Sequence, residues 1–197
     1  DSGSTVIVPA PPKDREGEWD LAEVREPHRL LEDLILNKGV CLALENVVEE
    51  IRQWPALDAA GLPRRQRLLL QGPPGCGKTT SAEAIAAELG RPLLIVRLDA
   101  VVSSYLGETA SNLRRIFEYA DQAPFVVLFD EFDALGRSRD DASEHGEMKR
   151  VVTAFLQMTD RYQGPSLLLA ATNHPGLLDE ALWRRFDEVL TFGLPTV

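Results

Sequence analysis

The sequence predicts an α/β fold in which a mostly parallel sheet lies between two layers of helices. Strand-like and helix-like segments alternate along most of the 197 residues, as in parallel sheets whose strands are joined by crossover helices. Residues 125–129 are all apolar, which indicates a strand buried on both faces. A glycine-rich loop at residues 72–77 separates an apolar run from a helix-favouring segment, the order of a strand–loop–helix unit. We therefore expect a three-layer α/β/α sandwich with a mostly parallel, five-stranded sheet.

The expected elements divide the chain into a short leading segment and one folded domain. Residues 1–27 contain several prolines and mixed charges without a sustained period, so we expect a linker, a flexible segment or a strap over the surface. The folded domain is expected over residues 28–197. Its expected strands are residues 68–71, 93–98, 125–129, 166–172 and 189–192. Helical patterns fill most of the segments between them, with loops expected at residues 103–109 and 136–143.

The composition and charge exclude several classes of protein. A formal net charge of -10 argues against a general nucleic-acid binder, because non-specific affinity for phosphate backbones comes from clustered Lys and Arg. No apolar run approaches the length of a transmembrane helix, so we expect no membrane segment. Cys41 and Cys76 are the two cysteines. They are too few for a disulfide scaffold, and we expect both to be reduced thiols in a cytoplasmic protein.

The glycine-rich loop matches the pattern G-x-x-x-x-G-K-[ST] of a phosphate-binding P-loop. Its glycines allow backbone N–H groups to turn toward a phosphate, and the start of the next helix adds a partial positive charge. Lys78 is expected to reach the β- and γ-phosphates, and Thr79 to place its hydroxyl on Mg²⁺. The predicted nucleotide-binding residues of the loop are Gly72, Pro73, Pro74, Gly75, Cys76, Gly77, Lys78, Thr79 and Thr80. The alternative is a glycine-rich turn without a ligand.

Polar residues follow two of the expected strands and complete the predicted site. Asp130 and Glu131 come directly after the apolar run at residues 125–129. Asp130 is expected to hold Mg²⁺ beside Thr79, and Glu131 to polarise the water that attacks a γ-phosphate. Asn173 ends the next strand and is placed to orient this water. The alternatives are a strand that happens to end in acidic residues and an asparagine that serves as a turn residue.

Together these motifs resemble the AAA+ ATPases, specifically the AAA subgroup that includes katanin, spastin and RuBisCO activase, over about residues 30–197. In that family the asparagine after the Ala-Thr strand is the first sensor, here Asn173. Residues 177–187 are similar to the region that supplies arginine fingers to a neighbouring subunit, which implies that Arg184 and Arg185 are catalytic. A guanidinium suits the charge that develops on the γ-phosphate. The two arginines are adjacent here, whereas Pro-Gly separates them in the common pattern. Which of them is the finger therefore stays open, and two surface arginines are the alternative.

The resemblance also implies contacts with the base and with a polypeptide. It places the adenine against the segment before the first helix, around Ile35. Residues 104–108, Ser-Tyr-Leu-Gly-Glu, are similar to the loop with which hexamers of this family hold an extended polypeptide in a central pore. Tyr105 and Leu106 are therefore the expected substrate contacts, since tyrosine offers a flat apolar face to many side chains. The alternative is a tyrosine packed within its own domain.

The function implied by the resemblance is ATP binding and Mg²⁺-dependent ATP hydrolysis in a homo-hexamer that threads polypeptide through a pore. The alternative is an assembly switch or scaffold that binds ATP and hydrolyses it slowly; Glu131 favours hydrolysis. The acidic charge disfavours a nucleic-acid loader, and the missing N-K-x-D motif disfavours a GTPase. In this family a helical lid follows the large α/β subdomain, and residues 194–197 fall where it would begin. We therefore expect the sequence to lack the lid, with weaker ATP binding, turnover and hexamer formation.

Overall fold

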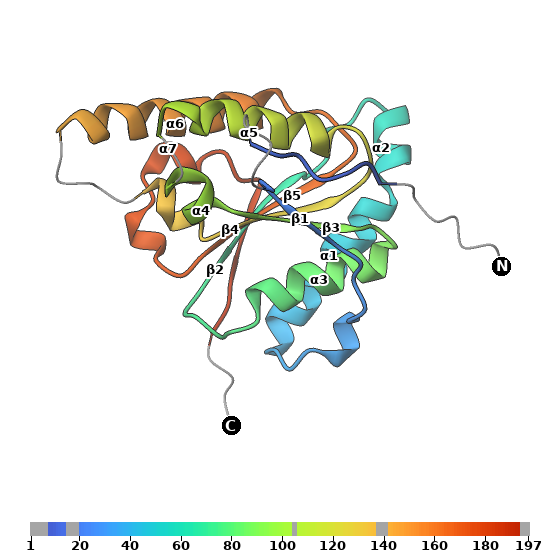
Figure 1. Cartoon of the computed structure of the whole chain (residues 1–197). Coiled ribbons are helices and arrows are strands. Elements are labelled where there is room, and N and C mark those ends of the chain that lie inside the picture. Colours follow the sequence, from blue (N-terminus) through green and yellow to red (C-terminus); the bar gives the residue numbers. More distant parts are fainter. Residues whose placement is uncertain (1–7, 15–19, 104–105, 137–141, 194–197) are drawn as a thin grey trace.

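The computed structural model describes residues 8–14, 20–103, 106–136 and 142–193. These residues form a twisted six-stranded sheet between two layers of helices (Figure 1). The strand order is β1-β3-β4-β5-β2-β6, and every neighbouring pair is parallel except β1 and β3. The strands are β1 (Glu23–Arg25), β2 (Arg67–Gln71), β3 (Leu93–Arg97), β4 (Val126–Asp130), β5 (Leu167–Thr172) and β6 (Glu188–Thr191). The predicted three-layer fold is confirmed, but the sheet has six strands rather than the expected five.

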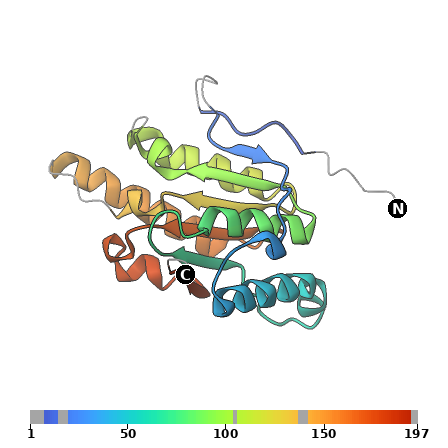
Figure 2. The ribbon, with the colours of Figure 1, turned by 90° about the horizontal axis from the view of Figure 1, so that it is seen from below.

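The additional strand lies in the segment for which the sequence predicts a linker or strap. Strand β1 pairs antiparallel with β3 at the edge of the sheet, with Glu23 opposite Ile95 (Figure 2). Ahead of β1, the Tyr119 hydroxyl donates a 2.7 Å hydrogen bond to Pro9 O. The described part of residues 1–27 therefore packs on the domain as a strap that includes an edge strand. A three-residue strand with charges at both ends gives no alternating hydrophobic pattern, so the sequence does not reveal it.

Helices cover both faces of the sheet and bury two hydrophobic layers. On one face lie α1 (Lys38–Arg52), α2 (Trp54–Ala59) and α3 (Lys78–Leu89), and on the other α4 (Leu98–Ser103), α5 (Leu106–Ala120), α6 (Ala142–Arg161) and α7 (Glu180–Trp183) (Figure 1). Side chains alternate along β2, so that Leu68 and Leu70 pack in the layer of α1 and α3 while Leu69 packs in the other layer. Three short 3-10 helices are η1 (Leu31–Asp33), η2 (Phe132–Leu135) and η3 (Pro175–Leu177).

The helices differ from the sequence expectation after β3. The sequence predicts a loop at residues 103–109, but α4 follows β3 directly and α5 begins at Leu106. Six residues make fewer than two helical turns, too short for a 3.6-residue period to be recognised. By contrast, the predicted helix before the first parallel strand is present as α1. Its first turn is capped by Asn37, whose Oδ1 accepts a 2.9 Å hydrogen bond from Val40 N.

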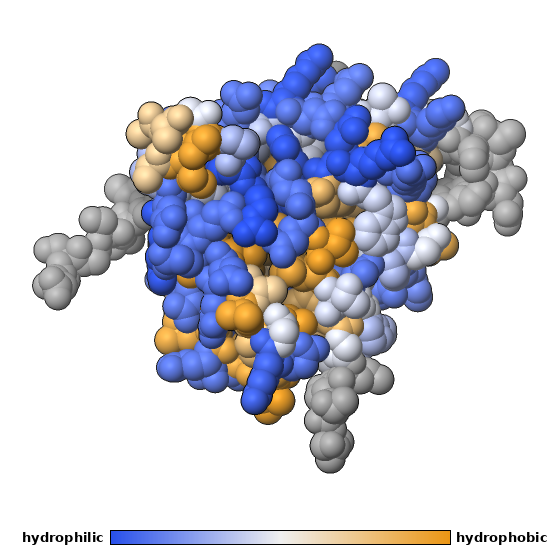
Figure 3. Space-filling view, turned by 180° about the vertical axis from the view of Figure 1, so that it is seen from behind, coloured by the Kyte–Doolittle hydropathy of each residue, from blue (hydrophilic) through white to orange (hydrophobic). Residues whose placement is uncertain are grey.

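Hydrophobic residues on the surface occur in small groups between hydrophilic ones on the face shown in Figure 3. Among the described residues, the large hydrophobic side chains that are exposed are Leu30, Ile35, Leu42, Leu62, Leu177 and Val189. None of the helices in the described ranges is both long enough and apolar enough to cross a bilayer.

Candidate active site

The loop between β2 and α3 has a shape that requires glycine at two positions. Gly72 has φ 153°, and a Cβ at this position would lie 2.4 Å from Phe192 O. Gly77 has φ 97°, and its Cβ would lie 3.1 Å from Leu36 Cδ2. Both conformations are unfavourable for L side chains. Because α3 begins at Lys78 directly after this loop, its unpaired N–H groups and helix dipole favour an anion there. The loop therefore fits a phosphate group.

Lys78 is buried, with 7% of its surface exposed, and its ammonium is held inside the loop. The Nζ donates hydrogen bonds to Gly72 O at 2.7 Å and Pro73 O at 2.9 Å. These two carbonyls partly compensate the ammonium for its lost hydration, but charged phosphate oxygens are stronger acceptors. The positive charge of Lys78, the predicted phosphate contact, therefore lies at the P-loop. Thr80, also predicted to bind nucleotide, donates from Oγ1 to Gly77 O at 2.9 Å and braces the loop from the helix side.

Hydrogen bonds join the ends of three parallel strands at the P-loop. Gly72 N donates to Thr172 O at 3.3 Å, which connects the end of β2 to the end of β5. The Thr172 hydroxyl donates to Asp133 Oδ1 at 3.3 Å, which connects β5 to the turn after β4. Asn173 follows Thr172 directly, and Asp130 and Glu131 lead into the same turn. The predicted phosphate, metal, base and sensor residues therefore share one edge of the sheet.

Glu131 has an unusual backbone and an unusual environment. It is the one non-glycine residue with positive φ, 52°, in the described part of the chain, a left-handed conformation that is rare outside functional sites and turns. Burial raises the pKa of its carboxyl above the ordinary value, and the neighbouring carboxylates of Asp130 and Asp133 raise it further. Asp130 itself accepts the Glu131 N–H at Oδ1, at 2.9 Å. A carboxylate with a raised pKa is better suited to accept a proton from water.

Two charged residues at this edge are not found by the sequence analysis. Arg97 ends β3 in register with Asp130, and its guanidinium lies 2.8 Å from Asp99 Oδ2. The positive charge of Arg97 opposes the rise in the pKa of Glu131, whereas Asp99 adds to it. The sequence places an arginine near the end of the second predicted strand. Its position beside Asp130 can be inferred only once β3 is known to pair with β4.

Thr79 and Asp130 form a donor set that fits Mg²⁺. Magnesium prefers oxygen ligands and usually takes only one or two from the protein, with the rest from phosphates and water. A hydroxyl near the start of α3 and a carboxylate at the end of β4 are oxygen ligands of this kind. No cluster of three or more His, Cys, Asp or Glu side chains able to hold a metal by themselves occurs in the described ranges.

Arg184 and Arg185 lie near the opposite end of the sheet. Both follow α7, and two residues later Asp187 N donates to Arg67 O, at the start of β2, at 2.7 Å. The P-loop begins at the other end of this strand, about 13 Å away at the usual rise per residue. Arg184 forms an exposed ion pair with Glu180 on α7. Arg185 Nε lies 2.8 Å from Asp160 Oδ1, an ion pair without hydrogen-bond geometry.

Of the remaining predicted contacts, the structure describes the adenine contact but not the side chains expected to hold a polypeptide. Ile35 is 86% exposed, and its neighbour Leu36 packs against the P-loop at Gly77. The segment expected to contact adenine therefore borders the phosphate loop. Tyr105 lies outside the described residues. Leu106 opens α5, but its side chain is outside the description as well.

Comparisons with known proteins identify the family. Residues 68–194 match the model of the "ATPase family associated with various cellular activities (AAA)". The chain is 48% identical over 96% of its length to an uncharacterised AAA family ATPase, y4kL, of Sinorhizobium fredii, and 41% identical over 77% to the peroxisomal ATPase PEX6 of Dictyostelium discoideum. It spans 56% and 14% of these two relatives. The crystal structure of the FIGL-1 AAA domain is similar in fold, with a TM-score of 0.74 and 29% sequence identity. The match covers 90% of the present chain and 59% of the FIGL-1 chain. The chain belongs to the AAA family of ATPases.

Proposed function

We propose that the chain binds ATP and hydrolyses it to ADP and phosphate at the carboxyl edge of the sheet. The observation that carries this proposal is the position of Thr172, which bonds both to Gly72 of the P-loop and to the turn after β4. These two hydrogen bonds bring the loop that contains the buried Lys78 ammonium and the turn that follows Glu131 to the same edge of the sheet. A phosphate loop beside a free carboxylate suits the attack of water on a γ-phosphate. Family membership and the relatives named as ATPases support the same activity.

Each residue of the site has one role in this reaction. The P-loop N–H groups and the Lys78 ammonium bind the phosphates and stabilise the negative charge that develops on them. Glu131 accepts a proton from water as the water oxygen bonds to the γ-phosphorus and the bond to the β–γ bridging oxygen breaks. Asn173 orients that water. When held by Thr79 and Asp130, Mg²⁺ would neutralise charge on the β- and γ-phosphate oxygens.

We further propose that Arg184 or Arg185 completes the site of a neighbouring subunit, so that the active form is an oligomer. Two observations support this. Arg185 pairs with Asp160, next to Thr159, whose carbonyl accepts from Arg67 at the start of β2, and the Arg184 side chain is 70% exposed. A guanidinium supplied in trans typically accelerates phosphoryl transfer by about 10³-fold or more. The AAA resemblance implies a homo-hexamer.

Ile35 is the proposed adenine contact, supported by its exposure beside the P-loop.

A polypeptide is the proposed second substrate, held by Tyr105 and Leu106 in the centre of the hexamer, and the cytoplasm is the proposed location. Replacing Tyr105 by Ala should leave ATP hydrolysis within about twofold, because the proposed role of Tyr105 is to contact the polypeptide rather than the phosphates. It should abolish ATP-dependent unfolding of a protein substrate.

The test is the ATPase rate per subunit across a wide range of protein concentration, with particle mass recorded at each point. A rate that climbs as oligomers form supports hydrolysis with an arginine in trans. Glu131→Gln serves as the control. It should bind ATP normally while hydrolysis falls by about 10²- to 10⁴-fold, the usual worth of a general base. Undiminished hydrolysis in this variant would remove Glu131 from the mechanism. Tight ATP binding with a flat, negligible rate in an assembled oligomer would instead identify a switch.

A further inference from the structure

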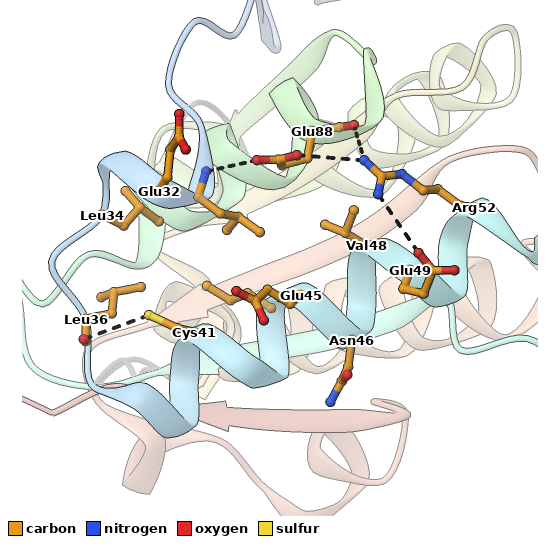
Figure 4. A pocket seen from close by; sticks show the side chains of 12 residues that line it. Glu32, Leu34, Leu36, Cys41, Glu45, Asn46, Val48, Glu49, Arg52 and Glu88 are labelled. Atoms are coloured by element: carbon orange, nitrogen blue, oxygen red, sulfur yellow. Dashed lines mark hydrogen bonds and ion pairs between the residues drawn. The ribbon is translucent and has the colours of Figure 1, made fainter.

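A hollow of about 630 Å³ lies between η1, α1 and the C-terminal half of α3 (Figure 4). We name it the η1–α1 groove. Its apolar lining comes from five aliphatic side chains, Leu31, Leu34, Leu36, Leu44 and Val48. Leu44 and Val48 belong to the buried core, so the bottom of the groove is formed by the hydrophobic layer under α1. Leu31, Leu34 and Leu36 are partly exposed and form the accessible apolar wall of the groove.

The rim of the groove is strongly acidic. Four glutamates line it, Glu32, Glu45, Glu49 and Glu88. Arg52 is the one cation in the lining, and it is already engaged, because its guanidinium donates to Glu88 O at 3.0 Å and lies 3.7 Å from the Glu88 carboxylate. The lining therefore carries a formal charge of −3. It favours a cationic group and repels phosphates and anionic lipid surfaces.

The apolar surface extends beyond the groove itself. Leu42 is 57% exposed and shares one face of α1 with Glu45 and Glu49, three and seven residues later. Leu30, at 38% exposure, directly precedes the lining residue Leu31 on the η1 side. Two exposed hydrophobic residues thus adjoin the groove. An extended surface of this kind fits a polypeptide better than a small molecule.

We propose that the η1–α1 groove binds a basic amphipathic helix of a partner protein. Leucine-like side chains on one face of such a helix would pack on the partly exposed leucines of the groove wall. Lysine or arginine on its flanks would meet the acidic rim, where Glu49 and Glu88 already pair with Arg52. A purely apolar segment would leave carboxylates partly desolvated without partners, which is unfavourable. A helix laid in a groove and held by side chains at helical spacing is a common mode of peptide recognition.

Occupation of the groove is coupled to the nucleotide site through two contacts. Leu36 lines the groove and also packs against Gly77 of the P-loop. Leu31 N donates to Glu88 Oε1 at 3.3 Å, which joins η1 to α3, the helix that begins at Lys78. The bound partner helix therefore alters nucleotide affinity, and nucleotide alters its affinity by the same factor. This coupling rests on the nucleotide binding proposed above, whereas the docking does not.

The test uses a fluorescent peptide with Leu and Lys at amphipathic helical spacing, and the same peptide with Glu replacing Lys. Fluorescence anisotropy measures binding of each to the intact chain. We expect the Leu/Lys peptide to bind and the Leu/Glu peptide not to bind. Leu42→Ser and Glu45→Lys should each weaken binding by about tenfold, since each removes or reverses one contact of the bound helix. All altered residues are exposed, so the fold should be retained.

Matched controls separate the groove from general attraction to an acidic protein. Leu62 is 55% exposed, and Leu62→Ser tests an equally exposed leucine elsewhere. Glu118→Lys makes the same charge change on α5. Both should leave binding within about twofold, the range of ordinary surface substitutions. Absence of Leu/Lys binding, or equal losses in the groove variants and their controls, overturns the docking proposal.

The coupling has its own readout. ADP affinity is measured with and without saturating Leu/Lys peptide, and peptide affinity with and without ADP; equal changes in both support the coupling. Unchanged affinities overturn the coupling and leave the docking in place. Failure of the chain to bind ADP at all would overturn the proposed function, while the peptide measurements would still decide whether the groove binds a basic helix.

Discussion

The two ends of β2 are built in different ways. At its carboxyl end the P-loop is held mainly by neighbours in sequence, with Lys78 and Thr80 bonded to carbonyls of the loop itself. At its amino end the partners come from across the chain. Asp187 Oδ2 accepts from Gln66 N and Arg67 N at 2.8 and 2.9 Å. The strand thus connects a locally encoded site to a region assembled from distant segments.

This difference separates two tasks. The carboxyl end holds the buried ammonium of Lys78 inside the P-loop. The amino end holds the turn after α7, where the exposed Arg184 pairs with Glu180 and Arg185 pairs with Asp160. Nucleotide binding should therefore depend on the first end, and acceleration of hydrolysis by a neighbour on the second. Substitutions at one end at a time can separate the two tasks.

The largest effect is expected from the arginines after α7. If one of them completes a neighbouring site, Arg184→Ala or Arg185→Ala should lower kcat by on the order of 10³-fold with nucleotide affinity unchanged. Steady-state ATPase rates and nucleotide titration measure the two quantities. Arg161→Ala, an exposed arginine at the end of α6, is the control and should change neither. Mixing the inactive arginine variant with a Lys78→Ala chain should restore part of the activity, because each supplies what the other lacks; no recovery would contradict action in trans.

At the carboxyl end, Lys78→Ala should weaken nucleotide binding by about 100-fold or more. The buried ammonium is removed, and the phosphates lose a desolvated charge partner, a change that commonly costs several kcal/mol. Calorimetric titration with ADP and with ATP measures the loss. It should be larger for ATP, whose γ-phosphate the lysine also contacts. Lys38→Ala, at the start of α1, provides the comparison. A Lys78→Ala chain that binds ATP like the unchanged protein would contradict the phosphate role.

The same contrast explains which features the sequence predicts. The P-loop is a contiguous pattern, and the central strands are mainly apolar. The strand segments along the chain and the positions of Asp130 and Glu131 at a strand end therefore follow from local residues. Strand β1 does not, because its three residues carry charges and gain their structure only by pairing with β3. The role of Arg97 likewise depends on the register that sets it beside Asp130. Contacts across long sequence separations leave little trace in any one segment.

Asp187 is such a contact, and its loss should affect stability more than binding. Its carboxylate accepts two backbone N–H groups at the start of β2. Asp187→Ala leaves these donors to solvent and should lower the free energy of unfolding by about 1–2 kcal/mol, while ADP affinity stays within about twofold. Urea denaturation measures the first quantity. Asp187→Asn keeps one acceptor oxygen and should lose less. An equal loss in both variants would show that the charge rather than the hydrogen bonding matters.

Arg65 should give the smallest effect, and its pH dependence reveals the cause. Its guanidinium bonds to Glu50 of α1 and lies 2.5 Å from Glu188 of β6. The hydrogen bond from Arg65 lowers the pKa of the Glu50 carboxyl below its usual value, against the opposing effect of burial. A lowered carboxyl pKa means that the folded state releases this proton more readily than the unfolded state. The resulting stabilisation is present above the unfolded pKa of Glu50 and is lost as pH falls through the folded one.

Arg65→Ala should therefore lower the free energy of unfolding by less than about 1 kcal/mol at neutral pH, because the pair is partly exposed to solvent. The difference from the unchanged protein should shrink as the medium is acidified below the ordinary carboxyl range. Urea denaturation at a series of pH values measures it, and Glu50→Gln in the Arg65→Ala background isolates the pair. A difference that stays constant on acidification would mean that Arg65 stabilises this end of β2 by packing its stem rather than by its charge, and would weaken the contrast drawn between the two ends of the strand.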